Sequence, residues 1–230
     1  MHTISDKKKT VVVIAVDGPT AAGKGTLARQ LARHLKFAYL DTGLLYRAVA
    51  AKALEHQLDW NNKDNPKLLD LAKNLTEVDL QSPSLREEKV GQTASIMATF
   101  PAIRAALLSF QRNFPESATA GNKLLQGAIL DGRDIGTVIW PEAQVKLFVT
   151  ALQEIRANRR YKELLNRGQQ VIHSQVLEDI KERDKRDQNR LHAPLIPAAD
   201  AVIIDNSDLN AEQAFQVALG HVQQRLANHH

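Results

Sequence analysis

Cysteine is absent from the 230 residues of the chain. Its absence excludes a disulfide framework, a thiolate metal centre and a cysteine nucleophile. A chain without cysteine suits a reducing compartment, so we expect a cytoplasmic protein. The eight histidines are scattered without the spacing of metal ligands, and a histidine metal centre is therefore not predicted.

Long apolar runs and aromatic residues are also scarce. The apolar run at residues 11–16 stops at Asp17, which is too short for a membrane helix or a signal sequence, so we expect no membrane partner. Aromatic residues make up 5% of the chain, which argues against the base-stacking surface of a nucleic-acid-binding protein. The net charge of +4 permits an anionic ligand, either a nucleic acid or a small phosphorylated molecule.

Short β-branched or apolar runs alternate with amphipathic segments along the chain. Residues 10–16 are typical of a strand buried on both faces, and leucines recur every fourth position in the helical segment 24–35. Further strands are expected at 37–40, 128–130, 145–149 and 201–204, and further helices at 44–56, 99–114, 153–167, 174–190 and 210–226. This alternation predicts an α/β fold, with a five-stranded parallel sheet covered by helices.

The pattern loosens between residues 57 and 97. A helix is expected at 68–75, and short strands at 78–80 and 89–90. We interpret 57–97 as an inserted subdomain, with 1–56 and 98–230 forming the core.

A glycine-rich loop joins the first strand to the first helix. Its spacing is G-x-x-x-x-G-K, in the strand-to-helix context that a phosphate loop requires, and an ordinary glycine turn explains this agreement poorly. Successive backbone N–H groups and the helix N-terminus would bind the phosphates of ATP, while Lys24 reaches its β- and γ-phosphates. The expected ATP-binding residues are Gly18, Pro19, Thr20, Ala21, Ala22, Gly23, Lys24, Gly25 and Thr26.

The loop departs from the usual motif at Gly25, where serine or threonine normally follows the lysine. The hydroxyl comes one position later, at Thr26. We expect Mg²⁺ with the ATP, and Thr26 and Asp131 are the candidates for its binding. The Gly-Lys-Gly-Thr ending resembles that of nucleoside monophosphate kinases such as adenylate kinase.

Two polar segments follow strands, where ligands of parallel sheets bind. After the second strand, Thr42 and Arg47 could receive an acceptor phosphate; the alternative is a helix cap with a solvated arginine. After the third strand, Asp131 suits Mg²⁺ and Arg133 suits phosphate, whereas a plain turn with a surface ion pair would also explain the segment.

Arginines concentrate in the two helices between residues 153 and 190. Arg183, Asp187 and Arg190 are spaced to share one helix face, from which Lys185 and Arg186 should point away. An ion-paired outer face is the alternative. In the preceding helix, Arg156, Arg159 and Arg160 are candidates to neutralise the transferring phosphoryl group from a cover at about 153–170.

Taken together, these segments resemble the bacterial cytidylate (CMP) kinase family over nearly the whole chain. The resemblance is carried by the phosphate loop and by the segments DTGLLYR (41–47), TASIMATFPAIRAAL (93–107), DGRDIGTVIWPEA (131–143) and IKERDKRDQNR (180–190). It implies a P-loop kinase fold whose insertion, 57–97, binds the nucleoside monophosphate. The implied reaction is transfer of a phosphoryl group from ATP to CMP or dCMP, and a monomer is the family expectation.

The resemblance also implies a role for each matching residue. Cytosine would be recognised by Ser95, Arg104 and Asp134, and the ribose by Arg183 and Asp187. The acceptor phosphate would be bound by Arg47, Arg133 and Arg190, with Thr42 beside them where the family usually has serine. The assignment of Ser95 depends on the resemblance alone.

An acceptor phosphate is already an anion near neutral pH, so no general base is required. Catalysis would then reduce to positioning and charge neutralisation by Lys24, Arg133, Arg156, Arg160 and Mg²⁺. The rival hypotheses are a kinase for another small acceptor such as UMP or shikimate, a nucleic-acid-binding regulator that uses the basic helices, and a non-catalytic nucleotide-binding module. The mixed arginine and aspartate face disfavours the nucleic-acid-binding regulator. The arginines on the acceptor side disfavour the non-catalytic module.

Overall fold

A computed structural model describes residues 11–122 and 124–228 of the chain. Residues 1–10, which we had assigned to the core, lie outside this range. The five expected strands form one parallel sheet in the order β2-β3-β1-β4-β5, which confirms the predicted fold class. Their bounds are β1 (Val12–Asp17), β2 (Ala38–Asp41), β3 (Gly127–Gly132), β4 (Val145–Thr150) and β5 (Val202–Asp205).

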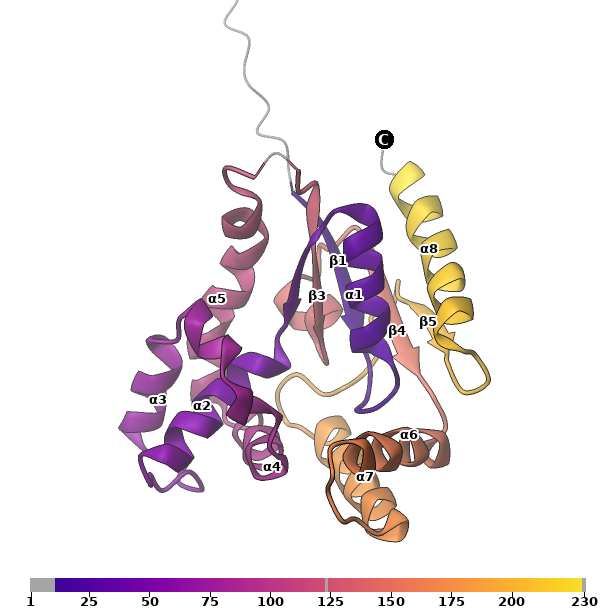
Figure 1. Cartoon of the computed structure of the whole chain (residues 1–230). Coiled ribbons are helices and arrows are strands. Elements are labelled where there is room, and N and C mark those ends of the chain that lie inside the picture. The colour runs from indigo at the N-terminus through magenta and orange to yellow at the C-terminus, as the bar shows by residue number, and fades with distance from the viewer. Residues whose placement is uncertain (1–10, 123, 229–230) are drawn as a thin grey trace, which may run out of the picture.

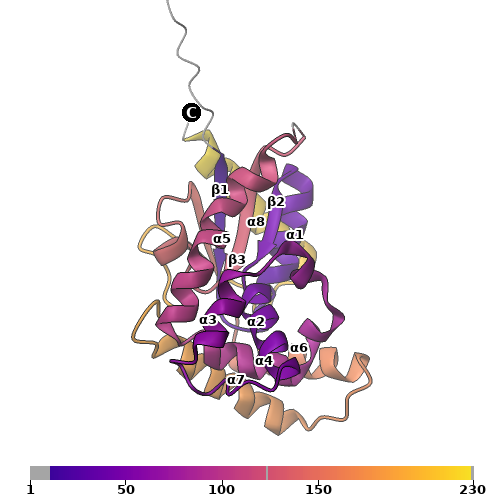
Figure 2. The same cartoon turned by 90° about the vertical axis from the view of Figure 1, so that its left-hand side faces the viewer.

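Helices cover both faces of this sheet (Figures 1 and 2). On one face, α1 (Lys24–Leu35) and α8 (Ala211–Ala227) pack against the side chains of Ile14 and Val16. On the other face, α5 (Pro101–Thr119) packs against Val13 and its neighbours. Side chains alternate between the two faces of a strand, so β1 is apolar on both and lies at the centre of the core.

Residues 57–97 form helices and no strand. After α2 (Gly43–Glu55) come α3 (Pro66–Lys73), the 3₁₀-helices η1 (Glu77–Gln81) and η2 (Pro83–Arg86), and α4 (Glu88–Met97). The strands predicted at 78–80 and 89–90 are therefore wrong. A capping box between Thr76 and Asp79 starts η1, and Val90 belongs to a helical stripe with Ala94 and Met97 that packs against α2 and α5.

The expected cover at about 153–170 is α6 (Gln153–Asn166), which packs against α7 (His173–Gln188); in the sequence, both helices lie between β4 and β5. They lie beyond the carboxyl ends of the strands, with α2 and α4 across from them (Figure 1). In the described residues, no single helix is long and apolar enough to cross a membrane, although α4 and α5 reach that length and composition together, bent by 101°.

A buried carboxylate links the end of β1 to the turn after β3. Both oxygens of Asp17 accept hydrogen bonds of 2.8 Å, from the backbone N–H groups of Ile135 and Gly136. These two residues begin a short π-helix, η3 (Ile135–Ile139), directly after Asp134. Burial raises the pKa of Asp17 to about 7, while the two N–H groups act to lower it. Asp17 thus fixes the phosphate loop relative to the segment that carries Arg133 and Asp134.

We predict that Gly18→Ala destabilises the protein by about 1–3 kcal/mol. Gly18 has a φ of 150°, and a Cβ there would lie 2.0 Å from the carbonyl oxygen of Val149 in β4. Gly220→Ala is the matched control, because Gly220 lies inside α8 with open space around it, and alanine should stabilise that helix by about 0.5–1 kcal/mol. Urea unfolding of both variants tests this; equal stability of the two would contradict it.

Candidate active site

The phosphate loop borders a cleft at the carboxyl edge of the sheet. Left-handed backbone at Ala21 and Gly23 curls the loop into the N-terminus of α1, which begins at Lys24. The cleft has a volume of about 670 Å³. We call it the phosphate cleft; on the loop side it is lined by Ala21, Gly23, Lys24, Gly25 and Thr26, and on the other sides by residues that include Asp41, Arg47, Asp131, Arg159 and Arg160.

Lys24 and Asp131 face each other in this cleft. The Nζ atom of Lys24 lies 3.7 Å from Oδ1 of Asp131. Burial, together with the positive charge of Arg133, lowers the pKa of Lys24. Burial raises the pKa of Asp131, while the charge of Lys24 opposes that shift. The pair brings a flexible cation and a carboxylate to the place where the loop would present the phosphates of a nucleotide.

The residues predicted to hold Mg²⁺ fit such an ion. Oδ1 of Asp131 is buried and has no hydrogen-bond partner among the described residues, whereas Oδ2 accepts from the hydroxyl of Tyr39 at 3.1 Å. Asp41, at the end of β2, lies beside Asp131 on the neighbouring strand β3, and both line the cleft with Thr26. Magnesium in proteins is commonly held by one or two carboxylates together with substrate phosphates and water.

The structure also explains the glycine after Lys24. A Cβ at Gly25 would lie 3.1 Å from Oδ2 of Asp131 and 3.8 Å from the Tyr39 hydroxyl. The Asp131 carboxylate therefore leaves little room for a side chain at this position, and Thr26, the next residue, lines the cleft.

A second, smaller pocket adjoins the phosphate cleft, and Arg47 lines both. It brings together eight of the nine residues predicted to bind the acceptor nucleotide, from α2, α4, α5, the end of β3, and α7 with the residues just after it. We call it the acceptor pocket; these eight residues are Thr42, Arg47, Ser95, Arg104, Arg133, Asp134, Arg183 and Arg190.

The ninth residue, Asp187, lies behind the pocket wall and binds two of the arginines that line the pocket. It accepts from Nε of Arg133 at 3.0 Å and from Nη2 of Arg190. Although burial acts to raise it, the charges of Arg133, Arg190 and Arg183 hold the pKa of Asp187 below its ordinary value. Burial, with the charge of Arg133, lowers the pKa of Arg183 to about 10, so Arg183 remains charged at neutral pH. The result is a buried excess of positive charge that suits an anion.

Arg104 and Asp134 form an ion pair in the wall of the acceptor pocket. Nη1 of Arg104 also donates to the carbonyl oxygen of Ala98 at 3.3 Å, and its guanidinium lies 5.9 Å from the centre of the Tyr46 ring. Burial raises the pKa of Asp134, and Arg104 opposes the shift. This part of the wall therefore offers donors and an acceptor that a polar base edge can use.

Thr42 and Arg47 are both held by backbone carbonyls. The Thr42 hydroxyl donates to the carbonyl oxygen of Asp131 at 2.9 Å. Nη1 of Arg47 donates to Leu85 in η2 at 2.8 Å, and its guanidinium fills the space beside Gly91 of α4, where a Cβ would lie within 3 Å of it. The alternative of a solvated Arg47 is therefore wrong.

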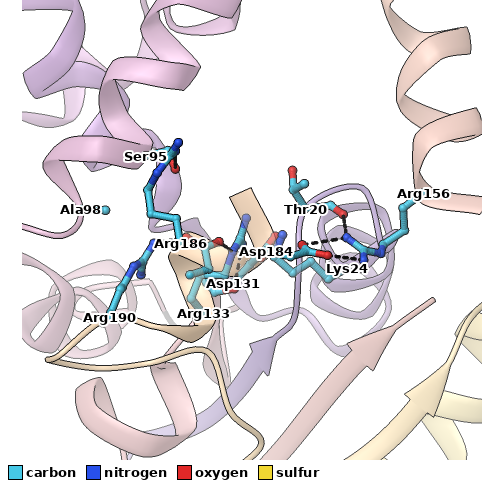
Figure 3. Close-up of polar contacts among 12 residues, drawn as sticks. Thr20, Lys24, Ser95, Ala98, Asp131, Arg133, Arg156, Asp184, Arg186 and Arg190 are labelled. Carbon is cyan, nitrogen blue, oxygen red and sulfur yellow. Dashed lines mark hydrogen bonds and ion pairs between the residues drawn. The ribbon is translucent and has the colours of Figure 1, made fainter. Parts of the chain in front are cut away.

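Arg156 does not line either cavity, contrary to its predicted position. Its side chain is buried in an ion pair with Asp184 of α7 and donates to the carbonyl oxygen of Thr20 at 3.3 Å (Figure 3). It also donates to the carbonyl oxygen of Ala151 at 2.9 Å. Asp184 lies one turn from Ile180 on the buried side of α7 and draws the guanidinium away from the cleft. Arg156 thus joins the cover to the phosphate loop.

Arg159 and Arg160 do line the phosphate cleft. Arg160 pairs with Glu88, the first residue of α4, and with Glu163 of its own helix. Arg159 donates to the carbonyl oxygen of Asn206 at 2.6 Å, and the Asn206 amide donates to Ala22 in the phosphate loop at 2.8 Å.

Arg186 also departs from expectation. Instead of pointing away from the site, it reaches across to α4, and its Nη1 donates to the hydroxyl of Ser95 at 2.8 Å (Figure 3). Sequence reasoning missed this contact along with the roles of Asp17, Tyr39 and Asp184. Asp17 and Asp184 are acids within or beside apolar helix or strand faces, which is a signal that an internal partner is needed; Tyr39 carries no comparable signal.

The fold and the site define a P-loop kinase, an enzyme that transfers a phosphoryl group from a nucleotide. The family model for cytidylate kinase matches residues 14–224. A cytidylate kinase from Paramagnetospirillum magneticum is 54% identical over 208 residues, covering 90% of this chain and 96% of that protein. One from Xanthobacter autotrophicus is 49% identical over 217 residues, covering 94% and 99%. The chain belongs to the cytidylate kinase family.

The solved structures that are similar to this chain have lower sequence identity than these relatives. A shikimate kinase from Bacteroides thetaiotaomicron covers 93% of this chain, with a TM-score of 0.48 and 11% sequence identity.

We predict that Asp184→Ala lowers the free energy of unfolding by about 3–5 kcal/mol, because it leaves the Arg156 guanidinium buried without its carboxylate. Asp179→Ala, at an exposed position of the same helix, should change it by less than about 0.5 kcal/mol. Chemical denaturation of both variants measures the difference. If Asp184→Ala lowered the free energy of unfolding no more than Asp179→Ala does, the ion pair would not anchor the cover.

Proposed function

We propose that this protein transfers the γ-phosphoryl group of ATP to CMP and dCMP, giving CDP and dCDP. One observation carries the proposal: the phosphate cleft, with Lys24, lies next to a pocket rich in arginine, and Arg47 lines both. Two anions can therefore meet end to end with positive charge around their junction. The family membership supports cytidine nucleotides as the acceptors.

Within the acceptor pocket, we assign the phosphate to Arg47, Arg133 and Arg190, beside Thr42. Ser95, Arg104 and Asp134 would read the cytosine, which offers an exocyclic amine as a donor and N3 and O2 as acceptors. Arg183 and Asp187 would contact the ribose. Because Asp187 lies behind the pocket wall and already accepts from two arginines, its contact with a sugar hydroxyl requires those arginine side chains to move as the nucleotide binds.

Catalysis requires no general base, because the attacking phosphate oxygen is already ionised near neutral pH. Lys24 and Arg160 would stabilise charge on the transferring group, and Arg133 would hold the acceptor against repulsion by the donor. When bound, Mg²⁺ would neutralise charge on the donor phosphates beside Thr26 and Asp131. Arg156 serves indirectly, since it holds the Thr20 carbonyl and so the shape of the loop.

The nucleoside monophosphate would be enclosed from two sides. We assign residues 57–97 to the subdomain that binds it and 153–170 to the cover, and closing both would exclude water and limit hydrolysis of ATP. We expect the enzyme to act as a cytoplasmic monomer on free nucleotides, without a nucleic-acid or membrane partner.

The test is an ADP-release assay with MgATP and each of CMP, dCMP, UMP, AMP, GMP and shikimate. We expect turnover led by CMP and dCMP. Lys24→Ala should lower it at least about 100-fold, because this lysine would contact the transferring group, in a variant that circular dichroism shows to be folded. A preference for another acceptor would overturn the assigned base-reading residues. Full activity of the variant would overturn the role of Lys24.

A further inference from the structure

Arg186 connects α7, which packs against the cover helix α6, to the wall of the acceptor pocket. It lies on α7, lines a cavity of about 230 Å³ next to that pocket, and donates from Nη1 to the hydroxyl of Ser95 at 2.8 Å. Ser95 is 4% exposed and lines both the cavity and the acceptor pocket. The serine therefore receives Arg186 from one side and faces the expected acceptor nucleotide on the other.

This contact determines which hydrogen bond Ser95 can offer. A serine hydroxyl has one proton and two lone pairs, whereas a guanidinium can only donate. Arg186 consequently occupies a lone pair, and the hydroxyl proton remains available. Among the described residues, no other hydrogen bond engages the Ser95 side chain. Ser95 is thus oriented as a donor toward the acceptor pocket.

Holding α4 against the cover does not require this contact. Glu88, at the start of α4, pairs with Arg160 of α6, and Arg167 just beyond α6 donates to the carbonyl oxygen of Arg86 at 3.3 Å. Glu88 is the first residue of α4 and Arg86 lies two residues before it, so both links are at the end of α4 opposite to Ser95. Lys185, beside Arg186 on α7, is exposed and makes no comparable side-chain contact within residues 11–122 and 124–228.

We propose that Arg186 is a positioning residue that presents the Ser95 proton to ring N3 of the acceptor base and so contributes to the choice of cytosine over uracil. N3 of cytosine accepts a hydrogen bond, whereas N3 of uracil carries a proton and cannot. The inference deepens the proposed function and rests on it. Removing Arg186 releases the hydroxyl to rotate, which costs the hydrogen bond to cytosine and leaves uracil less affected.

The experiment measures kcat/KM for CMP and UMP in the wild type, Arg186→Met, Lys185→Met, Ser95→Ala and the Arg186→Met/Ser95→Ala double variant. Methionine retains an unbranched apolar stem, and Lys185→Met removes the same charge one position away. We expect Arg186→Met to lower the CMP/UMP ratio about three- to tenfold. Lys185→Met should leave the ratio unchanged. In the Ser95→Ala background, Arg186→Met should have no further effect on it.

An unchanged ratio in Arg186→Met would overturn the proposal, as would an equal change with and without Ser95. General damage to the fold lowers kcat/KM for CMP and UMP together, so it leaves their ratio unchanged, whereas a change in specificity alters the ratio. Melting temperatures of all variants check the fold independently. A wild-type enzyme that does not phosphorylate CMP refutes the proposed function itself. A wild type that prefers CMP, with Arg186→Met behaving like Lys185→Met, refutes only the role of Arg186.

Discussion

A single buried carboxylate, Asp187, makes it possible to gather arginines at the edge of the sheet. Arg133 follows the end of β3, Arg183 lies on α7, and Arg190 lies two residues beyond the end of α7. Three guanidinium groups placed together in a partly dry site repel one another, and a buried charge without a partner costs several kcal/mol. Asp187 offsets this by bonding to two of them directly. It also ties α7 to the sheet, so the acceptor pocket and the cover depend on the same interaction.

The rest of the site follows from how parallel strands end. β1, β2 and β3 all finish at one edge, and this places the phosphate loop, Thr42 and the segment 131–134 side by side. Asp17, just before the phosphate loop, then accepts two backbone hydrogen bonds from the residues that follow segment 131–134, which holds the loop and this segment together. Phosphoryl transfer between two anions demands little covalent chemistry from the protein, so a rigid arrangement of cations at this edge supplies most of what the reaction needs.

The sequence predicted the sheet, the phosphate loop and most of the acceptor pocket because their signals are local. A β-branched run before G-x-x-x-x-G-K fixes strand, loop and helix together, and the spacing of Arg183 and Asp187 fixes one face of α7. The errors arose where a distant partner decides the outcome. Val90 alternates like a strand residue but packs as part of a helical stripe, and Arg156 turns toward Asp184, which lies 28 residues further along the chain.

Arg186 illustrates the same limit. Helical periodicity placed it away from the face of Arg183 and Asp187, yet Arg183 and Arg186 line the same cavity, because periodicity does not reveal what a long side chain can reach. Only the position of α4 beside α7 shows that Arg186 can reach Ser95. Ser95 itself was identified through the family resemblance, since nothing in its immediate sequence distinguishes it from an ordinary buried serine.

The most direct test of the account is the effect of Asp187→Asn on the KM for CMP and the KM for ATP. Asparagine preserves the shape of the side chain but removes the charge that holds Arg133 and Arg190. We expect the KM for CMP to rise at least about tenfold while the KM for ATP changes less than about twofold. Glu178→Gln, at an exposed position of the same helix, should alter neither. An unchanged KM for CMP, in a variant that remains folded, would contradict the central role of Asp187.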